Sequence, residues 1–124
     1  MVLDAGAFLA IERADRSTVA LLKRELLARR VPVTHGGVVA QVWRGGAGKQ
    51  ANLSGLLAAV EVVPLDDHLG RRAGVLLCRT RMADVIDAAV VLLAVDGDTI
   101  LTSDADDLSP LAAAATVHVD IVPV

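Results

Sequence analysis

The sequence has little cysteine, few aromatic residues and no long hydrophobic run. Its single cysteine, Cys78, excludes a disulfide within the chain and makes a reducing cytoplasm the expected compartment. Phe8 and Trp43 are its only aromatic residues, too few for a platform on which nucleic-acid bases stack. The longest apolar run, residues 88–95, is far shorter than the roughly 18–20 residues that cross a membrane. The N-terminus lacks a basic segment ahead of an apolar one, so no signal peptide is expected.

Apolar residues are abundant despite these absences. The hydrophobic fraction is 54% and the mean hydropathy is +0.56, so we expect exposed apolar surface that a partner covers. A length of 124 residues predicts one domain, residues 1–124, with a sizeable core. Cys78 has no Cys or His at metal-ligand spacing and is expected in that core. The net charge of −3 is unlike that of a high-affinity nucleic-acid binder.

Short apolar segments alternate with helical patterns along the chain. The candidate strands are residues 2–3, 31–34, 62–65, 99–102 and 117–122. The expected helices cover residues 5–11, 15–30, 35–44, 51–60, 66–80, 84–94 and 108–115. This alternation predicts an α/β fold, a three-layer α/β/α sandwich with a mainly parallel central sheet.

Acidic residues lie where two of these strands end and where one helix begins. Asp4 follows the first strand, and Asp104 follows the strand 99–102. Asp84 and Asp87 stand one turn apart at the start of an apolar helix. Because sites in α/β sheets form at the carboxyl ends of strands, we expect Asp4, Asp87 and Asp104 to converge. Carboxylates without counter-charges repel one another, so their convergence indicates a bound hard cation.

Helix capping is the alternative role for several of these acids. Asp84 fits an N-cap, with Asp87 as the reciprocal acid of a capping box, and for Asp84 alone we prefer that role. Asp106 and Asp107 fit caps of the helix that follows them. Asp107 is also three residues from Asp104, so either member of that pair is a candidate for the cluster.

Four segments resemble the PIN domain family, and most closely the VapC-type toxins of bacterial toxin–antitoxin pairs. They are VLDAGAF at the start, VVAQVWR in the middle, then VIDAAVVLLA and ILTSDADDL. These segments span essentially the whole chain in the family's order and spacing. The resemblance implies a PIN-like fold and a Mg2+- or Mn2+-dependent ribonuclease that a cognate VapB-like antitoxin holds inactive. It also implies a homodimer formed by apolar residues of the first helices.

The family's functional residues map onto particular positions of this chain. The resemblance assigns metal binding to three acids, Asp4, Asp87 and Asp104. It adds Asp107 to the catalytic residues, together with Gln41, which stands where the family usually has Glu. Gly6 stands where the family often has Ser or Thr. A Gln amide oxygen can coordinate a cation but brings no charge, so one metal is better supported than two. Metal-bound water would attack the RNA phosphodiester in line, and Gln41 would position water or a second ion.

Basic side chains and histidines have separate expectations. Five arginines are candidates for binding RNA phosphates: Arg44, Arg71, Arg72, Arg79 and Arg81. Their alternative role is a solvated helix face. The three histidines, His35, His68 and His118, share no metal-ligand spacing and are expected at the surface or in the core.

Other functions remain as alternatives. Because Gln41 replaces the usual Glu, the chain is alternatively a catalytically weakened module that binds RNA or an antitoxin. A phosphoacceptor receiver domain fits poorly, since Asp4 has no acidic neighbour and Lys23 and Lys49 are the only lysines. A phosphatase of the dehalogenase type also fits poorly, because its second acid would fall at Gly6.

Overall fold

The computed structural model of this chain describes residues 1–45, 48 and 50–124. Its strands are β1 (Val2–Leu3), β2 (Val33–His35), β3 (Glu61–Val63), β4 (Thr99–Thr102) and β5 (Asp120–Pro123). Its helices are α1 (Ala5–Glu12), α2 (Arg16–Leu27), α3 (Gly36–Val42), α4 (Ala51–Ala59), α5 (Asp67–Thr80), α6 (Val85–Leu93) and α7 (Ala105–Ala114). The strands form one sheet in the order β3-β2-β1-β4-β5, and each described strand is parallel to its neighbours. The predicted α/β fold with a parallel central sheet is confirmed.

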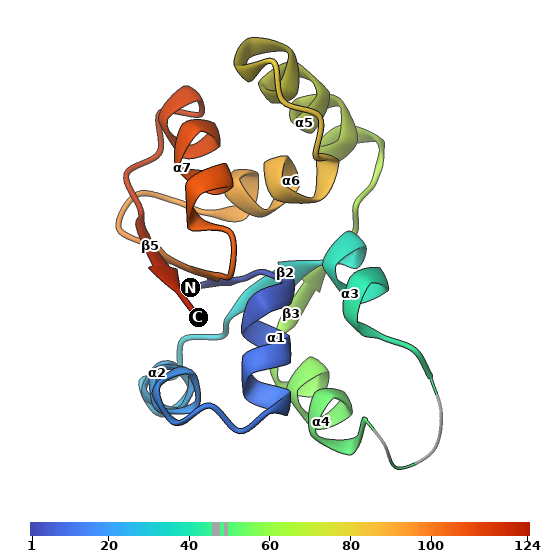
Figure 1. Cartoon of the computed structure of the whole chain (residues 1–124), viewed down its shortest axis with the longest axis vertical. Helices are drawn as coiled ribbons and strands as arrows, with labels where there is room; N and C mark the ends of the chain where they lie inside the picture. The colour runs from blue at the N-terminus through green and yellow to red at the C-terminus, as the bar shows by residue number, and fades with distance from the viewer. Residues whose placement is uncertain (46–47, 49) are drawn as a thin grey trace.

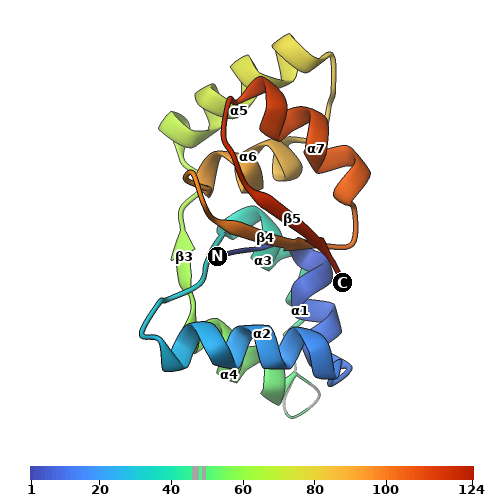
Figure 2. The ribbon, with the colours of Figure 1, turned by 90° about the vertical axis from the view of Figure 1, so that its left-hand side faces the viewer.

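The helices form two layers, one on each face of the sheet. In Figure 1, α1, α2 and α4 lie below the sheet and α5, α6 and α7 lie above it, and Figure 2 shows the same division from the side. Contacts follow these layers, since α1 packs against α2, α3 and α4, while α5, α6 and α7 pack against one another. The strand order explains the division. The chain moves from β1 outward to β2 and β3, then returns across the sheet to β4 and β5, and right-handed crossovers in opposite directions place helices on opposite faces.

Aliphatic side chains fill the space between the layers. The largest fully buried hydrophobic side chains are Phe8, Leu3, Leu53, Ile100, Leu101, Leu108 and Leu111. The central strands β1 and β4 are buried on both faces, which explains why their segments are apolar without alternation. No helix in the described ranges has the length and apolar character needed to cross a lipid bilayer. Cys78 is exposed on α5, so the expectation that it lies in the core is wrong.

Element ends differ from the predicted ones by a few residues, each for a local reason. α7 begins at Ala105 instead of residue 108, because Asp104 takes the N-cap position. β2 begins at Val33, directly after Pro32, which has no N–H to donate to a neighbouring strand. α2 ends at Leu27 instead of residue 30, and Arg29 has a left-handed φ of 57°.

Gly6 lets α1 approach the chain that follows β4. A Cβ at this position would lie 2.5 Å from the backbone N of Ser103, which cannot move without shifting the end of the strand. We expect Gly6→Ala to lower the free energy of unfolding by about 1–3 kcal/mol.

Gly55, in α4, is the matched control, because a Cβ there meets nothing within 4 Å. Gly55→Ala should raise stability by up to about 1 kcal/mol. Urea unfolding of both variants checks this, and equal effects would contradict the close approach.

Candidate functional site

The strand order reverses between β1 and β4, the two central neighbours of the sheet. From β1 the chain proceeds outward to one edge of the sheet, and from β4 it proceeds to the other. Ligands of open α/β sheets bind at the carboxyl ends of strands beside such a reversal. The register pairs Leu3 with Leu101, and the Asp4 N–H donates to the Leu101 carbonyl at 3.0 Å. Asp4 and Thr102 are therefore neighbours at the place where a site is expected.

Thr102 links two of the predicted acids. Its hydroxyl donates to Asp4 Oδ2 at 2.7 Å, and the Asp104 N–H donates to Thr102 Oγ1 at 3.0 Å. Asp4 is only 3% exposed, and its Oδ1 accepts the N–H of Ala5 at 2.7 Å as the N-cap of α1. Both carboxylate oxygens of Asp4 thus have donors that hold the side chain in one orientation. The sequence did not identify Thr102 as a site residue, since its place beside Asp4 follows only from the pairing of β1 with β4.

Asp87 reaches the site from the first turn of α6. Asp84 is the N-cap of this helix, and its Oδ1 accepts the N–H of Ile86 at 2.8 Å and that of Asp87 at 3.1 Å. The preferred capping role of Asp84 is confirmed. Asp87 itself is half-buried, and its side chain makes no hydrogen bond to another described residue.

Electrostatics place Asp87 among the other acids. Burial raises the pKa of Asp87 from 3.8 to about 7, and the negative charge of Asp84 is the next largest cause. Smaller contributions to the raised pKa come from the charges of Asp4, Asp104 and Asp107. Because Coulomb interactions weaken with distance, Asp4, Asp104 and Asp107 are close enough to Asp87 for their charges to act on it. Each of these influences opposes ionisation of Asp87.

Carboxylate oxygens are the ligands that hard divalent cations prefer, but the acids of the described residues do not form a ready-made cage. In the part of the chain that the structure describes, no three or more His, Cys, Asp or Glu side chains are grouped so as to hold a metal ion. Charges act over longer distances than the roughly 2.0–2.6 Å of a metal–oxygen bond. The acids can therefore raise the pKa of Asp87 without being grouped closely enough to hold a metal ion. Mg2+ usually takes only one or two protein carboxylates and keeps several waters. Carboxylate oxygens also suit Mn2+.

An open cavity of about 440 Å³ lies beside the start of α7. Its lining residues are Ser103, Asp104, Ala105, Asp106, Asp107 and Pro123. Asp104, Asp106 and Asp107 are all exposed, and the latter two lie in the first turn of α7. This cavity gives solvent, a cation or a substrate access to the acids from β4 and α7.

Gln41 lies apart from the hydrogen bonds of this cluster. It is exposed near the end of α3, and its side-chain amide has no hydrogen-bond partner among the described residues. Its backbone carbonyl accepts from Arg44 Nη2 at 2.8 Å. The structure therefore leaves the Gln41 amide available to solvent and does not join it to the carboxylates.

The five predicted RNA-binding arginines do not form a single group. Arg44 donates to three carbonyls at the end of α3, those of Ala40, Gln41 and Trp43. Arg71 pairs with Asp67 at 2.9 Å, and both side chains are exposed. Arg81 is the left-handed C-cap of α5. Only Arg71, Arg72 and Arg79 line a common groove.

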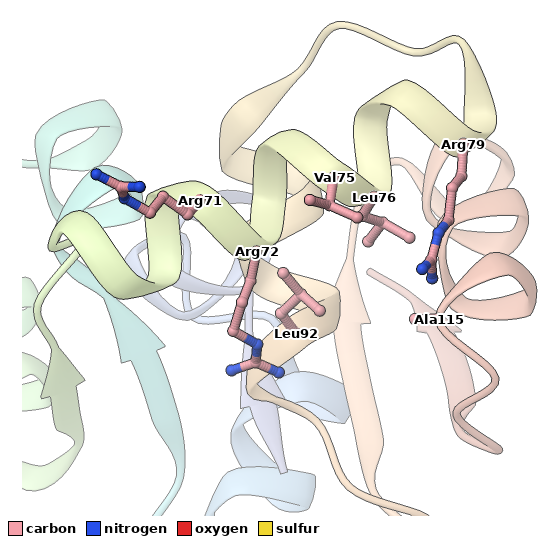
Figure 3. Close-up of a pocket in the computed structure, with 7 residues that line it drawn as sticks. All are labelled: Arg71, Arg72, Val75, Leu76, Arg79, Leu92 and Ala115. Carbon is pink, nitrogen blue, oxygen red and sulfur yellow. The ribbon is translucent and has the colours of Figure 1, made fainter.

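That groove has an apolar lining. It includes Leu92 near the C-terminal end of α6 and Ala115 at the C-terminal end of α7, whereas Asp87 and Asp104 lie at the N-terminal ends of these helices. Its volume is about 340 Å³, and its apolar lining is Val75, Leu76, Leu92 and Ala115. In Figure 3 the side chains of Arg72 and Arg79 extend from α5 in the same direction, whereas Arg71 points away from them. Ala115 is the C-cap of α7 and Asp104 is its N-cap, so roughly 16 Å of helix separate these two residues.

The histidines occupy the expected kinds of place. His35 is 0% exposed and its Nδ1 accepts the N–H of Gly37 at 3.0 Å, as the N-cap of α3. His68 and His118 are exposed. None of the three contributes to a group of metal ligands in the described ranges.

Replacement of Asp87 should stabilise the protein in a pH-dependent way. The folded-state pKa of about 7 lies above the usual unfolded value of about 3.9, so ionised Asp87 opposes folding. This cost is absent below about pH 4, grows as the pH rises, and is complete above about pH 7. We expect Asp87→Asn to raise Tm by about 5 °C at pH 8 and to change it little at pH 4. Asp120→Asn, an equal charge change at an exposed residue of β5, is the control for scanning calorimetry. A gain for Asp87→Asn that is independent of pH would contradict the crowding of carboxylates.

Comparison with known family models and curated proteins finds no match to this chain. The fold and the carboxylate cluster therefore rest on the structure, and the assignment to the PIN domain family remains a prediction from the motifs.

Proposed function

We propose that the chain is a metal-dependent ribonuclease of the PIN type, a VapC-like toxin that a cognate antitoxin neutralises. The observation that supports this proposal is that the charges of Asp4, Asp104 and Asp107 all contribute to the raised pKa of Asp87, with Asp4 and Asp104 beside the reversal of strand order. The acids concerned are Asp4, Asp87, Asp104 and Asp107. They are also the residues onto which the motif resemblance maps the family's metal-binding and catalytic acids.

The proposed reaction is hydrolysis of RNA phosphodiester bonds. Asp4, Asp87 and Asp104 would hold Mg2+ or Mn2+, directly or through water, with Asp107 tuning the site. When bound, the cation supplies Lewis acidity and a water of lowered pKa. Thr102 keeps Asp4 and Asp104 in a fixed relation. Because the pKa of Asp87 is about 7, protons compete with a cation for this carboxylate below neutral pH.

RNA would need positive side chains away from the acids. Arg72 and Arg79 are the better candidates of the five, because neither forms an ion pair or hydrogen bond with the described residues. Arg71 is already paired with Asp67. Arg44 uses its guanidinium to cap α3, so a phosphate would compete with those carbonyls.

Partners of the proposed toxin would use the apolar face of the first helices. A groove of about 440 Å³ lies between α1, α2 and α4, and it is lined chiefly by aliphatic side chains such as Ile11, Leu22 and Leu56. Leu26, at its border, is 37% exposed. This surface supports binding of an antitoxin segment or of a second copy in a homodimer. The exposed thiol of Cys78 suits a cytoplasmic protein.

One alternative has specific support. The chain would be a weakened module that binds RNA or antitoxin without efficient cleavage. Gln41 brings no charge where the family has Glu, and the carboxylates of the described residues form no ready-made cage. Restored cleavage in Gln41→Glu would identify this state.

The decisive experiment uses the purified chain, free of any partner, with total RNA. We expect cleavage in Mn2+ that EDTA abolishes. Asp87→Asn should reduce the rate by at least about 100-fold, because loss of a metal ligand costs more than loss of an outer-shell group. Asp120→Asn is the matched control and should cleave normally. Since Asp87→Asn is expected to stabilise the fold, its loss of activity cannot be attributed to unfolding. RNA binding without cleavage by the wild type would favour the weakened module.

A further inference from the structure

His35 connects two helices through its buried ring. Nδ1 accepts the N–H of Gly37, and Nε2 lies 3.1 Å from the carbonyl oxygen of Ile86. A ring nitrogen that accepts an N–H carries no proton, so the proton of the neutral ring is on Nε2 and is donated to Ile86. Burial lowers the pKa of His35, which keeps the ring neutral. The ring therefore joins the start of α3 to the first turn of α6.

This contact acts on the peptide group that leads into Asp87. The carbonyl of that group, from Ile86, accepts from His35, and its N–H, from Asp87, donates to Asp84 Oδ1. A peptide group is planar, so holding both polar atoms fixes its plane and the direction in which the chain enters Asp87. Packing adds a second restraint, because a Cβ on Gly37 would lie 2.4 Å from Ile86 Cδ1. The two helix starts are thus in close contact at this point.

The preceding residue, Thr34, makes an equivalent contact for Asp4. Its buried hydroxyl donates to the carbonyl of Leu3 at 2.8 Å, and Leu3 directly precedes Asp4. β2, which contains Thr34 and His35, pairs with β1 in the sheet. Two consecutive residues at the end of β2 therefore hold the residues that precede two separate site acids.

We propose that His35 is a positioning residue that, with the help of Thr34, sets the spacing between Asp87 and Asp4. Neither His35 nor Thr34 donates a hydrogen bond to a site carboxylate, so both act through the backbone. An effect of His35 on metal binding rests on the proposed function. Its effect on the spacing between Asp87 and Asp4 does not, because that spacing is a property of the protein alone. Outer-shell groups that orient metal ligands typically contribute about 10–100-fold to metal affinity.

His35→Asn separates the two contacts of the ring. Asn is a preferred N-cap, so it can keep the bond to Gly37, but its side chain is too short to reach the Ile86 carbonyl as well. Thr18→Val is the matched control. It removes a buried hydroxyl that donates to Asp15 Oδ1 at 2.7 Å. Asp15 caps the start of α2 and is not one of the site acids.

The first readout is Mn2+ binding by titration calorimetry of the folded chain. We expect His35→Asn to weaken binding by about 10–100-fold and Thr18→Val to leave it within about twofold. Thr34→Val, which loses only the bond to Leu3, should weaken binding in the same direction and provides a second test should His35→Asn fail to fold. Unchanged Mn2+ affinity in folded His35→Asn or Thr34→Val would overturn the inference.

The second readout needs no metal. The rise in Tm that Asp87→Asn is expected to produce at pH 8 depends on the burial of Asp87 and on the charges around it, and both change if the first turn of α6 shifts. That rise should shrink by about half or more when His35→Asn is already present, and should persist in the presence of Thr18→Val. A full rise in the His35→Asn background would also overturn the inference. If His35→Asn reduces the rise in Tm but the wild type binds no Mn2+, the proposed function is refuted and the positioning role stands.

Discussion

The burial of Asp87 close to other aspartates is the constraint on which the rest of the site depends. It opposes ionisation of Asp87, whose pKa burial and neighbouring charges raise to about 7. A fold keeps such an arrangement only if other contacts prevent the acids from moving apart. Thr102 holds Asp4, Asp84 holds the first turn of α6, and the aliphatic core fixes the elements that carry them. Departures from local stability of this kind are typical of functional sites.

Much of the fold follows from local patterns in the sequence. Apolar segments at β1 and β4, separated by helical periodicities, predict a parallel sheet because consecutive parallel strands require crossover helices. The position of acids after these strands predicts where a site opens, and Asp84 is recognisable as a cap from its neighbours alone. The predictions of the parallel sheet and of the Asp84 cap succeed because each depends on residues within a few positions of one another.

The contacts that orient the acids could not be predicted in the same way. The bonds from Thr34 to Leu3, His35 to Ile86 and Thr102 to Asp4 join residues 31, 51 and 98 positions apart. They depend on strand order, which alternation of strands and helices does not determine.

The arginines show the opposite case, in which residues adjacent in the sequence have different contacts in the structure. Arg71 and Arg72 are adjacent in sequence and both line the groove, yet Arg71 pairs with Asp67 and points away from Arg72.

Capping and clustering of acids are complementary roles in this fold. Asp4 and Asp84 accept N–H groups at the starts of α1 and α6, and Asp104 takes the N-cap position of α7. Three helices thus direct their N-termini, with partial positive charge, at the place where the acids gather. Each terminus stabilises a nearby carboxylate by about 0.3–1 kcal/mol, which offsets only part of the repulsion. Under the proposed function, a divalent cation would offset the remainder.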